Sequence, residues 1–152
     1  MQIEPTGVKR DLNPGRTAAW LAKQVELGLG AVDLSLPQYR ILGLLAESSA
    51  VHSYLAERLS VRPSSVTAIV DGLVARGLVE RRHVASDRRQ VDHVLTAEGR
   101  CVLDTADADT TSRLHDIAGC LDDAGDTERA FDGLQAWREA FGAYRLARRA
   151  TR

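Results

Sequence analysis

The sequence predicts a mainly α (α+β) fold in which a helix-turn-helix is followed by a two-stranded hairpin, with long helices at both ends. One observation is an amphipathic helix beginning near Pro63, because residues 66, 69, 70, 73 and 74 are apolar and share one helical face. Another is a pair of short β-like runs, 78–84 and 90–96, joined by A-S-D-R-R. The last is a nearly heptad apolar spacing between residues 127 and 149.

The N-terminal third predicts an arm and two helices. Residues 1–15 are polar and contain two prolines, so we expect a flexible arm. A first helix is predicted over about 16–30, where Gly28 and Gly30 weaken its end. A second helix is expected to begin at Ser35 or Leu36, because Pro37 is tolerated in a first turn, where its missing N–H costs nothing.

The helix-turn-helix is predicted over residues 53–76. Its first helix, about 53–59, buries Leu55, Ala56 and Leu59, and the small Ala56 allows a crossing helix to approach closely. The turn is 60–62, and Gly77 ends the second helix. The opposite face of the second helix is small and polar, as expected for a helix that lies in a groove; it carries Ser64, Ser65, Thr67, Ala68 and Asp71.

The hairpin tip places Asp87, Arg88 and Arg89 together. Two adjacent guanidiniums repel each other and contribute nothing to a core, whereas the preceding carboxylate can hold one in place. A positioned arginine at an exposed tip is suited to bind something anionic. Taken alone, the same segment is also typical of a solvated charged turn.

The C-terminal half predicts two long helices. Thr96 is suited to cap a polar, acidic helix over 97–119, with a turn at 121–126 and a last helix over about 127–149. A seam of the kind found in the last helix packs against another helix. Its apolar positions are Ala130, Leu134, Trp137, Phe141 and Tyr144.

Composition is that of one globular domain, with 152 residues, 44% hydrophobic and 27% charged. No apolar run approaches the roughly 18 residues of a membrane span, and the N-terminus lacks a secretory pattern, so we expect a cytoplasmic protein without a membrane partner. The net charge of −1 is unevenly distributed. Residues 51–100 carry eight arginines against six acids, residues 101–143 carry three against ten, and the segment from Tyr144 adds four arginines.

Three segments in this order resemble the MarR family of transcriptional regulators: L-S-L-P-Q-Y-R-I-L at 34–42, the stretch from L-A-E-R-L-S to L-V-E-R at 55–81, and D-R-R-Q-V-D-H-V-L-T-A-E-G at 87–99. The resemblance covers roughly residues 16–149. It implies a winged helix-turn-helix at 35–96 and a helical dimerisation region formed by 16–34 and 97–149. It also implies a homodimer that acts as a repressor on a near-palindromic operator in double-stranded DNA, without a cofactor.

The resemblance assigns roles to individual residues. Arg89 would enter the minor groove, braced by Asp87, while Arg88 would meet a phosphate. Narrow minor grooves concentrate negative potential, which a fixed arginine exploits. The full set of expected DNA-binding residues is Arg62, Ser64, Ser65, Thr67, Arg81, Arg82, Arg88 and Arg89, with Asp87 as the brace.

This sequence departs from the family pattern at two places. Ser60 occupies a turn position where glycine is frequent. Ala68 and Asp71 stand where larger basic residues often occur, so direct base readout is expected to be thin.

The resemblance further implies a small aromatic or phenolic ligand that releases the DNA. Its pocket would lie between the dimerisation helices and the winged domain. Trp20, Tyr39 and His52 are the candidate pocket residues. Trp137, Phe141 and Tyr144 are expected in a dimer core rather than in a ligand pocket.

Histidines and cysteines offer other sites. His83 and His93 could share one face of the hairpin, but without a cysteine or carboxylate cluster we expect surface histidines and no metal. Cys101 and Cys120 are 19 residues apart with no C-x-x-C motif, so small buried residues are favoured over oxidant sensors.

The sequence also bears on functional classes other than a DNA-binding regulator. An enzyme is disfavoured, because the sequence contains neither a nucleophile with an oriented base nor a phosphate-binding loop. A redox-controlled regulator of the same fold remains open. So does a winged helix that binds only proteins, which would not need Asp87 and Arg89 and would lack the salt dependence of DNA binding.

Overall fold

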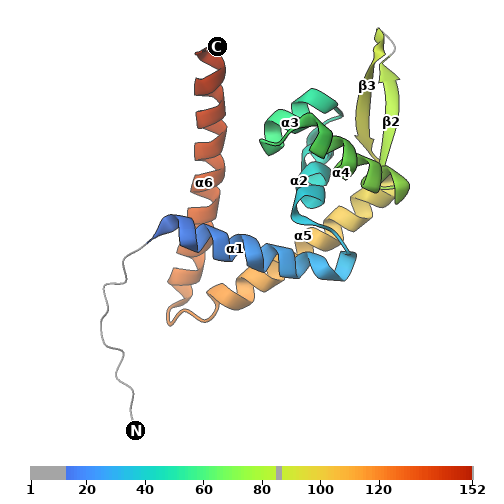
Figure 1. The fold of residues 1–152 in the computed structure, drawn as a ribbon. Coiled ribbons are helices and arrows are strands. Elements are labelled where there is room, and N and C mark those ends of the chain that lie inside the picture. The colour runs from blue at the N-terminus through green and yellow to red at the C-terminus, as the bar shows by residue number, and fades with distance from the viewer. Residues whose placement is uncertain (1–12, 85–86, 152) are drawn as a thin grey trace.

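The computed structural model describes residues 13–84 and 87–151, apart from the side chains of residues 84, 87–90, 124 and 149. Its elements are α1 (Pro14–Gly28), the 3₁₀ turn η1 (Leu29–Val32), α2 (Leu36–Glu47), β1 (Ala50–Val51), α3 (His52–Leu59), α4 (Pro63–Ala75), β2 (Val79–Val84), β3 (Asp87–Leu95), α5 (Ala97–Ala118) and α6 (Ala124–Ala150). Figure 1 shows α2, α3, α4 and the sheet as one body, with α1 beside α5 and α6 standing apart.

The caps of several helices follow directly from the sequence. Ser35 accepts a hydrogen bond from the Gln38 backbone N–H, and the Gln38 side chain accepts one from the Ser35 N–H, so α2 begins with a capping box. Thr96 caps α5 by accepting from the Gly99 N–H. Gly77 follows α4 with φ of +70°, the left-handed conformation expected of a glycine after a helix.

The sheet has the strand order β1–β3–β2, with both pairs antiparallel. β2 and β3 form the predicted wing, whereas β1 is a third strand that the sequence did not reveal, because two residues are too short to show an alternating pattern. β3 begins at Asp87 instead of Gln90, since pairing continues through the charged residues as far as Val84 opposite Asp87. An exposed ribbon tolerates charged side chains, so their presence does not mark its end.

The hydrophobic core lies in the winged helix-turn-helix and the first half of α5. The predicted faces of α3 and α4 are buried as expected, including Leu55, Val66, Val70 and Leu73, all 0% exposed. From α5, Leu103 and Ala106 complete the core. By contrast, no side chain of α1 and no described side chain of α6 is buried.

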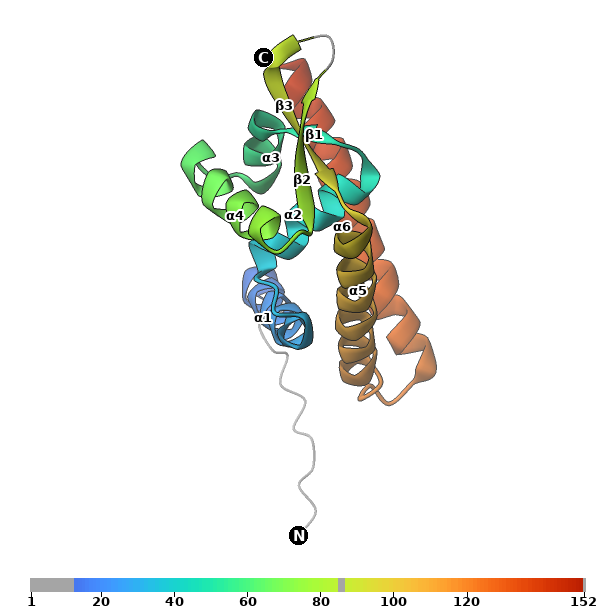
Figure 2. The same cartoon turned by 90° about the vertical axis from the view of Figure 1, so that its right-hand side faces the viewer.

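The terminal helices differ in detail from the sequence-based boundaries. α1 begins at Pro14, because Asn13 caps it by accepting from the Arg16 N–H, and α1 ends at Gly28. α6 begins at Ala124 within the predicted turn, because Asp123 caps it by accepting from the Gly125 N–H. Figures 1 and 2 both show α6 returning toward the end of the molecule that carries the wing. None of the helices in the described part of the chain combines the length and apolar character of a membrane span.

Candidate nucleic-acid interface

The second helix of the helix-turn-helix, α4, is fixed by a turn that the sequence left open. Ser60 adopts the left-handed conformation, with φ of 58°, and its N–H donates to the Glu57 carbonyl. The Val61 N–H donates to the Ala56 carbonyl, which closes the end of α3 in the manner of a helix C-cap. A serine here therefore performs the role of the usual glycine, at the steric cost of a left-handed L-residue.

The polar face of α4 is exposed as the sequence predicted. Ser64, Ser65 and Thr67 are exposed on it, while Val66 and Val70 on the other face are buried in the core. Arg62 is the residue at the helix N-cap position and is also exposed. The four predicted contacts in this region therefore lie on or beside one solvent-facing surface.

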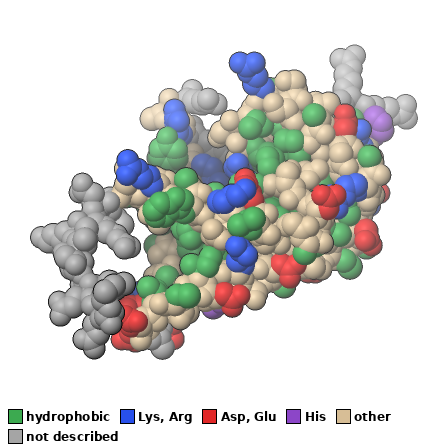
Figure 3. Space-filling model, turned by 60° about the horizontal axis from the view of Figure 1, so that its bottom comes forward, with side chains coloured by type: hydrophobic (Ala, Val, Ile, Leu, Met, Phe, Trp, Pro, Cys, Tyr) green, Lys and Arg blue, Asp and Glu red, His purple; other side chains and the backbone are tan. Residues whose placement is uncertain are grey.

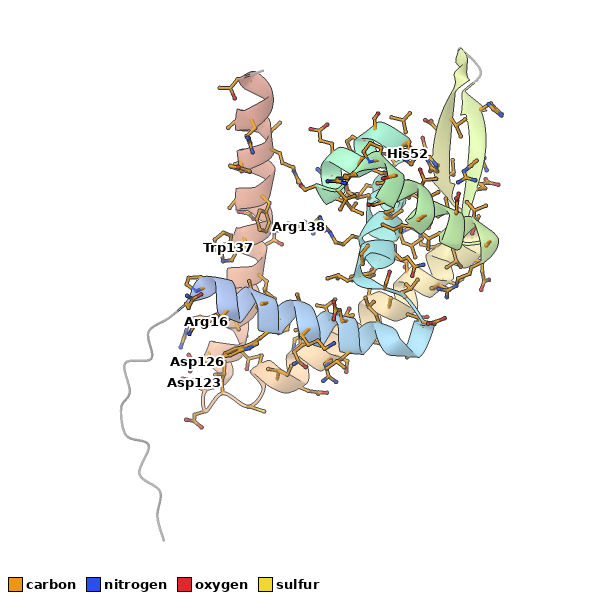
Figure 4. All side chains as sticks on the ribbon, viewed as in Figure 1. Arg16, His52, Asp123, Asp126, Trp137 and Arg138 are labelled. Carbon is orange, nitrogen blue, oxygen red and sulfur yellow. The ribbon has the colours of Figure 1, made fainter. Side chains whose placement is uncertain are left out.

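His52 restrains the first turn of α4. Its Nε2 lies 2.8 Å from the Pro63 carbonyl oxygen, and because a carbonyl only accepts, Nε2 must carry the hydrogen and donate. Thr67 Oγ1 also donates to the Pro63 carbonyl, at 3.3 Å, and lies 3.3 Å from His52 Nε2. His52 therefore ties α3 to the start of α4, a positioning role that the sequence did not suggest (Figure 4).

Ion pairs engage the two arginines at the base of the wing. Arg81 of β2 pairs with Asp71 of α4, and Arg82 pairs with Glu80. All four side chains are substantially exposed, so the pairs are weak and exchangeable with phosphate. Asp71, which the sequence marked as unusual on this helix, thus connects α4 to the wing.

The wing tip carries the predicted minor-groove residues. β3 begins at Asp87, so Asp87, Arg88 and Arg89 belong to the strand and not to the connecting loop. Their side chains lie outside the described residues, as do residues 85 and 86 altogether. The expected bracing of Arg89 by Asp87 therefore stays a prediction.

His93 is buried at 3% exposure, so the expectation of two surface histidines on the wing is wrong for this residue. The strand register does place His83 and His93 on one face of the wing, but β1 pairs with β3 only at Asp92 and His93. His93 Nδ1 donates to the Ala50 carbonyl at 3.1 Å, and its ring centroid lies 5.9 Å from that of His52. Burial holds the pKa of His93 below its usual range, against the opposing effect of the Ala50 hydrogen bond.

An open groove of about 530 Å³ separates the start of α4 from the wing. Its wall includes His52, Thr67, Arg81 and His93, so it brings together residues from α3, α4, β2 and β3. The polar face of α4 and the wing are therefore adjacent surfaces, connected by the Arg81–Asp71 ion pair and by the neighbouring rings of His52 and His93.

The three predicted ligand-pocket residues have different surroundings. Trp20 on α1 is 70% exposed. The Tyr39 hydroxyl donates to Asp107 Oδ1 of α5 at 2.5 Å; burial and then this hydrogen bond raise the pKa of Tyr39. His52 contacts α4, as described above. Asp107, which connects α5 to α2, was not singled out by the sequence because it is one acid among many on α5.

Both cysteines are exposed, so the expectation of small buried residues is wrong. Cys101 lies two positions before Leu103, which places it on the opposite side of α5, and Cys120 follows the end of that helix. Nineteen residues of largely helical chain separate them by about 28 Å, too far for a disulfide within one chain. Within the described residues, no group of three or more histidine, cysteine or acidic side chains is arranged to hold a metal.

Comparison with known proteins gives a consistent result. The model of the MarR family matches residues 32–90, from the end of η1 into the wing. The HTH-type transcriptional repressor YetL of Bacillus subtilis is 35% identical over 74 residues, covering 47% of this chain and 44% of YetL. The HTH-type transcriptional repressor Rv2887 of Mycobacterium tuberculosis is 32% identical over 94 residues, covering 61% of this chain and 68% of that protein.

Solved structures extend the similarity beyond the matched segment. RV1404 from Mycobacterium tuberculosis has a TM-score of 0.73 at 25% identity, covering 84% of this chain and 88% of that one. The MarR family protein RV2887 in complex with p-aminosalicylic acid has a TM-score of 0.67 at 25% identity, covering 82% of this chain and 94% of that one. The chain thus shares its fold over most of its length, whereas it spans less than half of YetL.

Proposed function

We propose that this chain, which belongs to the MarR family of DNA-binding transcriptional regulators and is not an enzyme, acts as a homodimeric repressor on a near-palindromic operator. The observation that carries the proposal is the exposed polar face of α4 beside a basic wing. Ser64, Ser65 and Thr67 project from a helix whose opposite face is locked into the core. Small side chains of this kind allow the helix to lie close to base edges in a major groove.

The wing would add contacts that flank the recognition helix. We assign Arg81, Arg82 and Arg88 to phosphates and Arg89 to the adjacent minor groove, with Arg62 at the start of α4. Because the base-reading face of α4 lacks large basic residues, wing contacts and DNA shape would carry much of the selectivity.

The exposed apolar face of α6 supports dimerisation. Trp137 is 60% exposed and Phe141 56%, on a helix with no described buried side chain, whereas Tyr144, which the sequence placed in the same seam, lines a groove between α6 and α3. Exposed apolar side chains gathered in this way mark interaction surfaces. Trp137 lies on the side of α6 that is turned away from α3 (Figure 4). Figure 3 shows that further hydrophobic side chains are exposed among charged ones when the bottom of the molecule is brought forward. Residues 16–34 and 97–149 would form the dimerisation region around the winged domain at 35–96.

A small aromatic acid is the ligand class that we propose for release from DNA. The support is the related RV2887, whose structure holds p-aminosalicylic acid. Trp20, Tyr39 and His52 are the first residues to test, and Tyr39 is already restrained by Asp107 of α5. By thermodynamic reciprocity, any ligand that weakens operator binding must itself bind more weakly when operator is present.

The test of DNA binding is footprinting of the full chain on its own upstream region, followed by anisotropy titrations of the protected duplex. Arg89→Ala should reduce the binding free energy by about 1–3 kcal/mol with the fold intact. Glu98→Ala, which alters a charge at the base of the wing, is the matched control and should leave affinity within twofold or raise it. Absence of any salt-dependent DNA binding by the wild type would favour a protein-binding module instead.

The test of dimerisation is light scattering, which should give twice the 16.6 kDa chain mass. The double variant Trp137→Asp/Phe141→Asp should be monomeric, because it buries carboxylates in the proposed interface. Gln135→Asp lies on the opposite side of α6 and should remain dimeric. A monomeric wild-type protein at micromolar concentration would contradict the proposed assembly.

A redox-controlled regulator is the second candidate, favoured by the exposure of Cys101 and Cys120. Peroxide treatment should then weaken operator binding in the wild type but not in the double variant Cys101→Ser/Cys120→Ser. Equal responses of the two proteins would remove this candidate.

A further inference from the structure

The charge of α6 reverses along its length. Its first two-thirds contain acidic residues, whereas its last residues, 144–150, hold three arginines and no acid. Cations at a helix C-terminus interact favourably with the helix dipole, which accounts for one or two of these residues by itself. The dipole does not explain why these arginines lie close to a basic residue of another element.

The arginine-rich end of α6 faces α3 across a groove of about 500 Å³, which we call the α3–α6 groove. Arg58 and Ser60 line it from the helix-turn-helix, and Tyr144, Arg145 and Arg148 line it from α6. Among the described residues that line the groove, three carry guanidiniums and one, Glu57, carries a carboxylate. This is a concentration of positive charge in a chain whose net charge is −1.

Aromatic rings hold two of these arginines in position. The Arg58 guanidinium carbon lies 5.6 Å from the Tyr54 ring centroid, and its Nε is buried with no hydrogen-bond partner among the described residues. Arg148 lies 5.7 Å from the Tyr144 ring centroid and donates to the Tyr144 hydroxyl at 3.2 Å. Stacked guanidiniums lose less side-chain entropy on binding, and their remaining donors suit the oxygen pair of a phosphate.

The groove lies toward the end of the molecule that carries the wing. Figures 1 and 2 both show the C-terminal end of α6 at the same end as the wing. Figure 1 also shows that α6 lies on the side of α3 opposite to the wing. Because Trp137 and Phe141 would bring two α6 helices together at the dimer centre, the groove would lie between the two recognition helices.

We propose that Arg58, Arg145 and Arg148 form a phosphate-binding site that contacts the DNA backbone at the centre of the operator, between the half-sites. The proposal rests on the function proposed above. The partner is a phosphodiester of the duplex, so the site adds affinity and salt dependence without base specificity. It also gives a role to the C-terminal arginines, which neither the recognition helix nor the wing explains.

The experiment compares anisotropy titrations of the footprinted duplex across a range of salt concentrations. Arg145→Ala/Arg148→Ala should lose about tenfold in affinity and lower the magnitude of the log–log salt slope by about 2–4, because each phosphate contact contributes about 0.9 and the dimer holds two copies. Arg145→Lys/Arg148→Lys should retain the slope. Arg138→Ala is the matched control, since it removes an arginine from the same face of α6 two turns earlier, and it should match the wild type.

A second arm locates the contact on the DNA. Neutral methylphosphonate linkages at the centre of the duplex should weaken the wild type and cause a clearly smaller loss in Arg145→Ala/Arg148→Ala, which retains only Arg58 of the proposed site. Light scattering establishes that each variant has the mass of the wild type. If the double variant retains wild-type affinity and slope, or if the wild type ignores the central methylphosphonates, the proposal is overturned. Failure of the wild type to bind any duplex would instead overturn the proposed function.

Discussion

Replacing Gly99 by alanine should destabilise the protein, although alanine is the better helix former. Gly99 lies in the first turn of α5, where that helix passes the base of the wing. A Cβ at this position would lie 2.1 Å from the Leu78 carbonyl oxygen and 2.8 Å from Leu95 Cδ1. Ordinary contacts are about 3.5–4 Å, so the backbone of Leu78 must move by more than an ångström.

The cost follows from what that backbone holds. The Leu78 carbonyl accepts a hydrogen bond from the Thr96 N–H at 3.1 Å, and Thr96 Oγ1 donates to the Gly77 carbonyl at 2.7 Å. Overpacking costs about 1–3 kcal/mol, and a lost hydrogen bond adds about 1 kcal/mol. The helix propensity of alanine offsets up to about 1 kcal/mol. The net loss should be about 1–3 kcal/mol.

Urea denaturation at a fixed protein concentration measures this change, and the melting temperature should fall by roughly 4–8 °C for a 2 kcal/mol loss. Gly43→Ala in α2 is the matched control, because a Cβ there meets no atom within 4 Å. That variant should be more stable than the wild type by about 0.5–1 kcal/mol. If Gly99→Ala is as stable as Gly43→Ala, the described packing of α5 against the wing is wrong.

Three further outcomes follow from single contacts. Because the pKa of His93 is lowered in the folded protein, the unfolded chain takes up a proton at a higher pH than the folded one does. The free energy of unfolding should therefore be greatest above about pH 6.5 and decrease as the pH falls below it. Thermal melts should show a smaller decrease for His93→Gln and the wild-type decrease for the exposed His83→Gln. Arg76→Ala should cost about 1 kcal/mol in urea titrations, because Arg76 donates to two carbonyls before α2, at 2.5 and 2.9 Å. Ser60→Gly should add about 0.5–1 kcal/mol by the same assay, because it relieves the left-handed serine; an unchanged or lower stability would contradict that backbone assignment.

Local patterns predicted the helix-turn-helix because its signals are short-range. Periodic apolar residues identified the buried face of α4, and Ser35 and Thr96 marked helix starts that the structure confirms. The unusual serine of the turn was visible in the sequence, but its left-handed backbone was not. A turn conformation depends on both helices that it joins, so propensity alone leaves it open.

The features that the sequence did not predict depend on long-range neighbours. The period of two along β3 places His93 on the same face as Val91, but its burial involves Ala50 of β1 and His52 of α3, which are about forty residues away along the chain. The exposure of Cys101 follows from the rotational position of Leu103 and Ala106 on α5, which a sparse apolar stripe defines poorly. The α3–α6 groove lies between two segments that are about ninety residues apart in the sequence, and no local sequence pattern predicts that they are close in space.

In our proposals α6 takes part in both dimerisation and DNA binding, whereas the wing and the recognition helix α4 take part only in DNA binding. In the proposed homodimer, one face of α6 holds the partner and its basic end holds the central phosphates. α6 also contacts α5 near their connecting turn, through the stacked rings of His115 and Phe131 at 4.1 Å and the Thr127 hydroxyl bonded to the Ala118 carbonyl. A ligand that alters the spacing between subunits would therefore displace the phosphate contacts and the recognition helices together. The ligand can lower the affinity of the protein for operator DNA only by the ratio of its own affinities for the two subunit spacings. A ligand that binds both spacings equally tightly would therefore not release the operator.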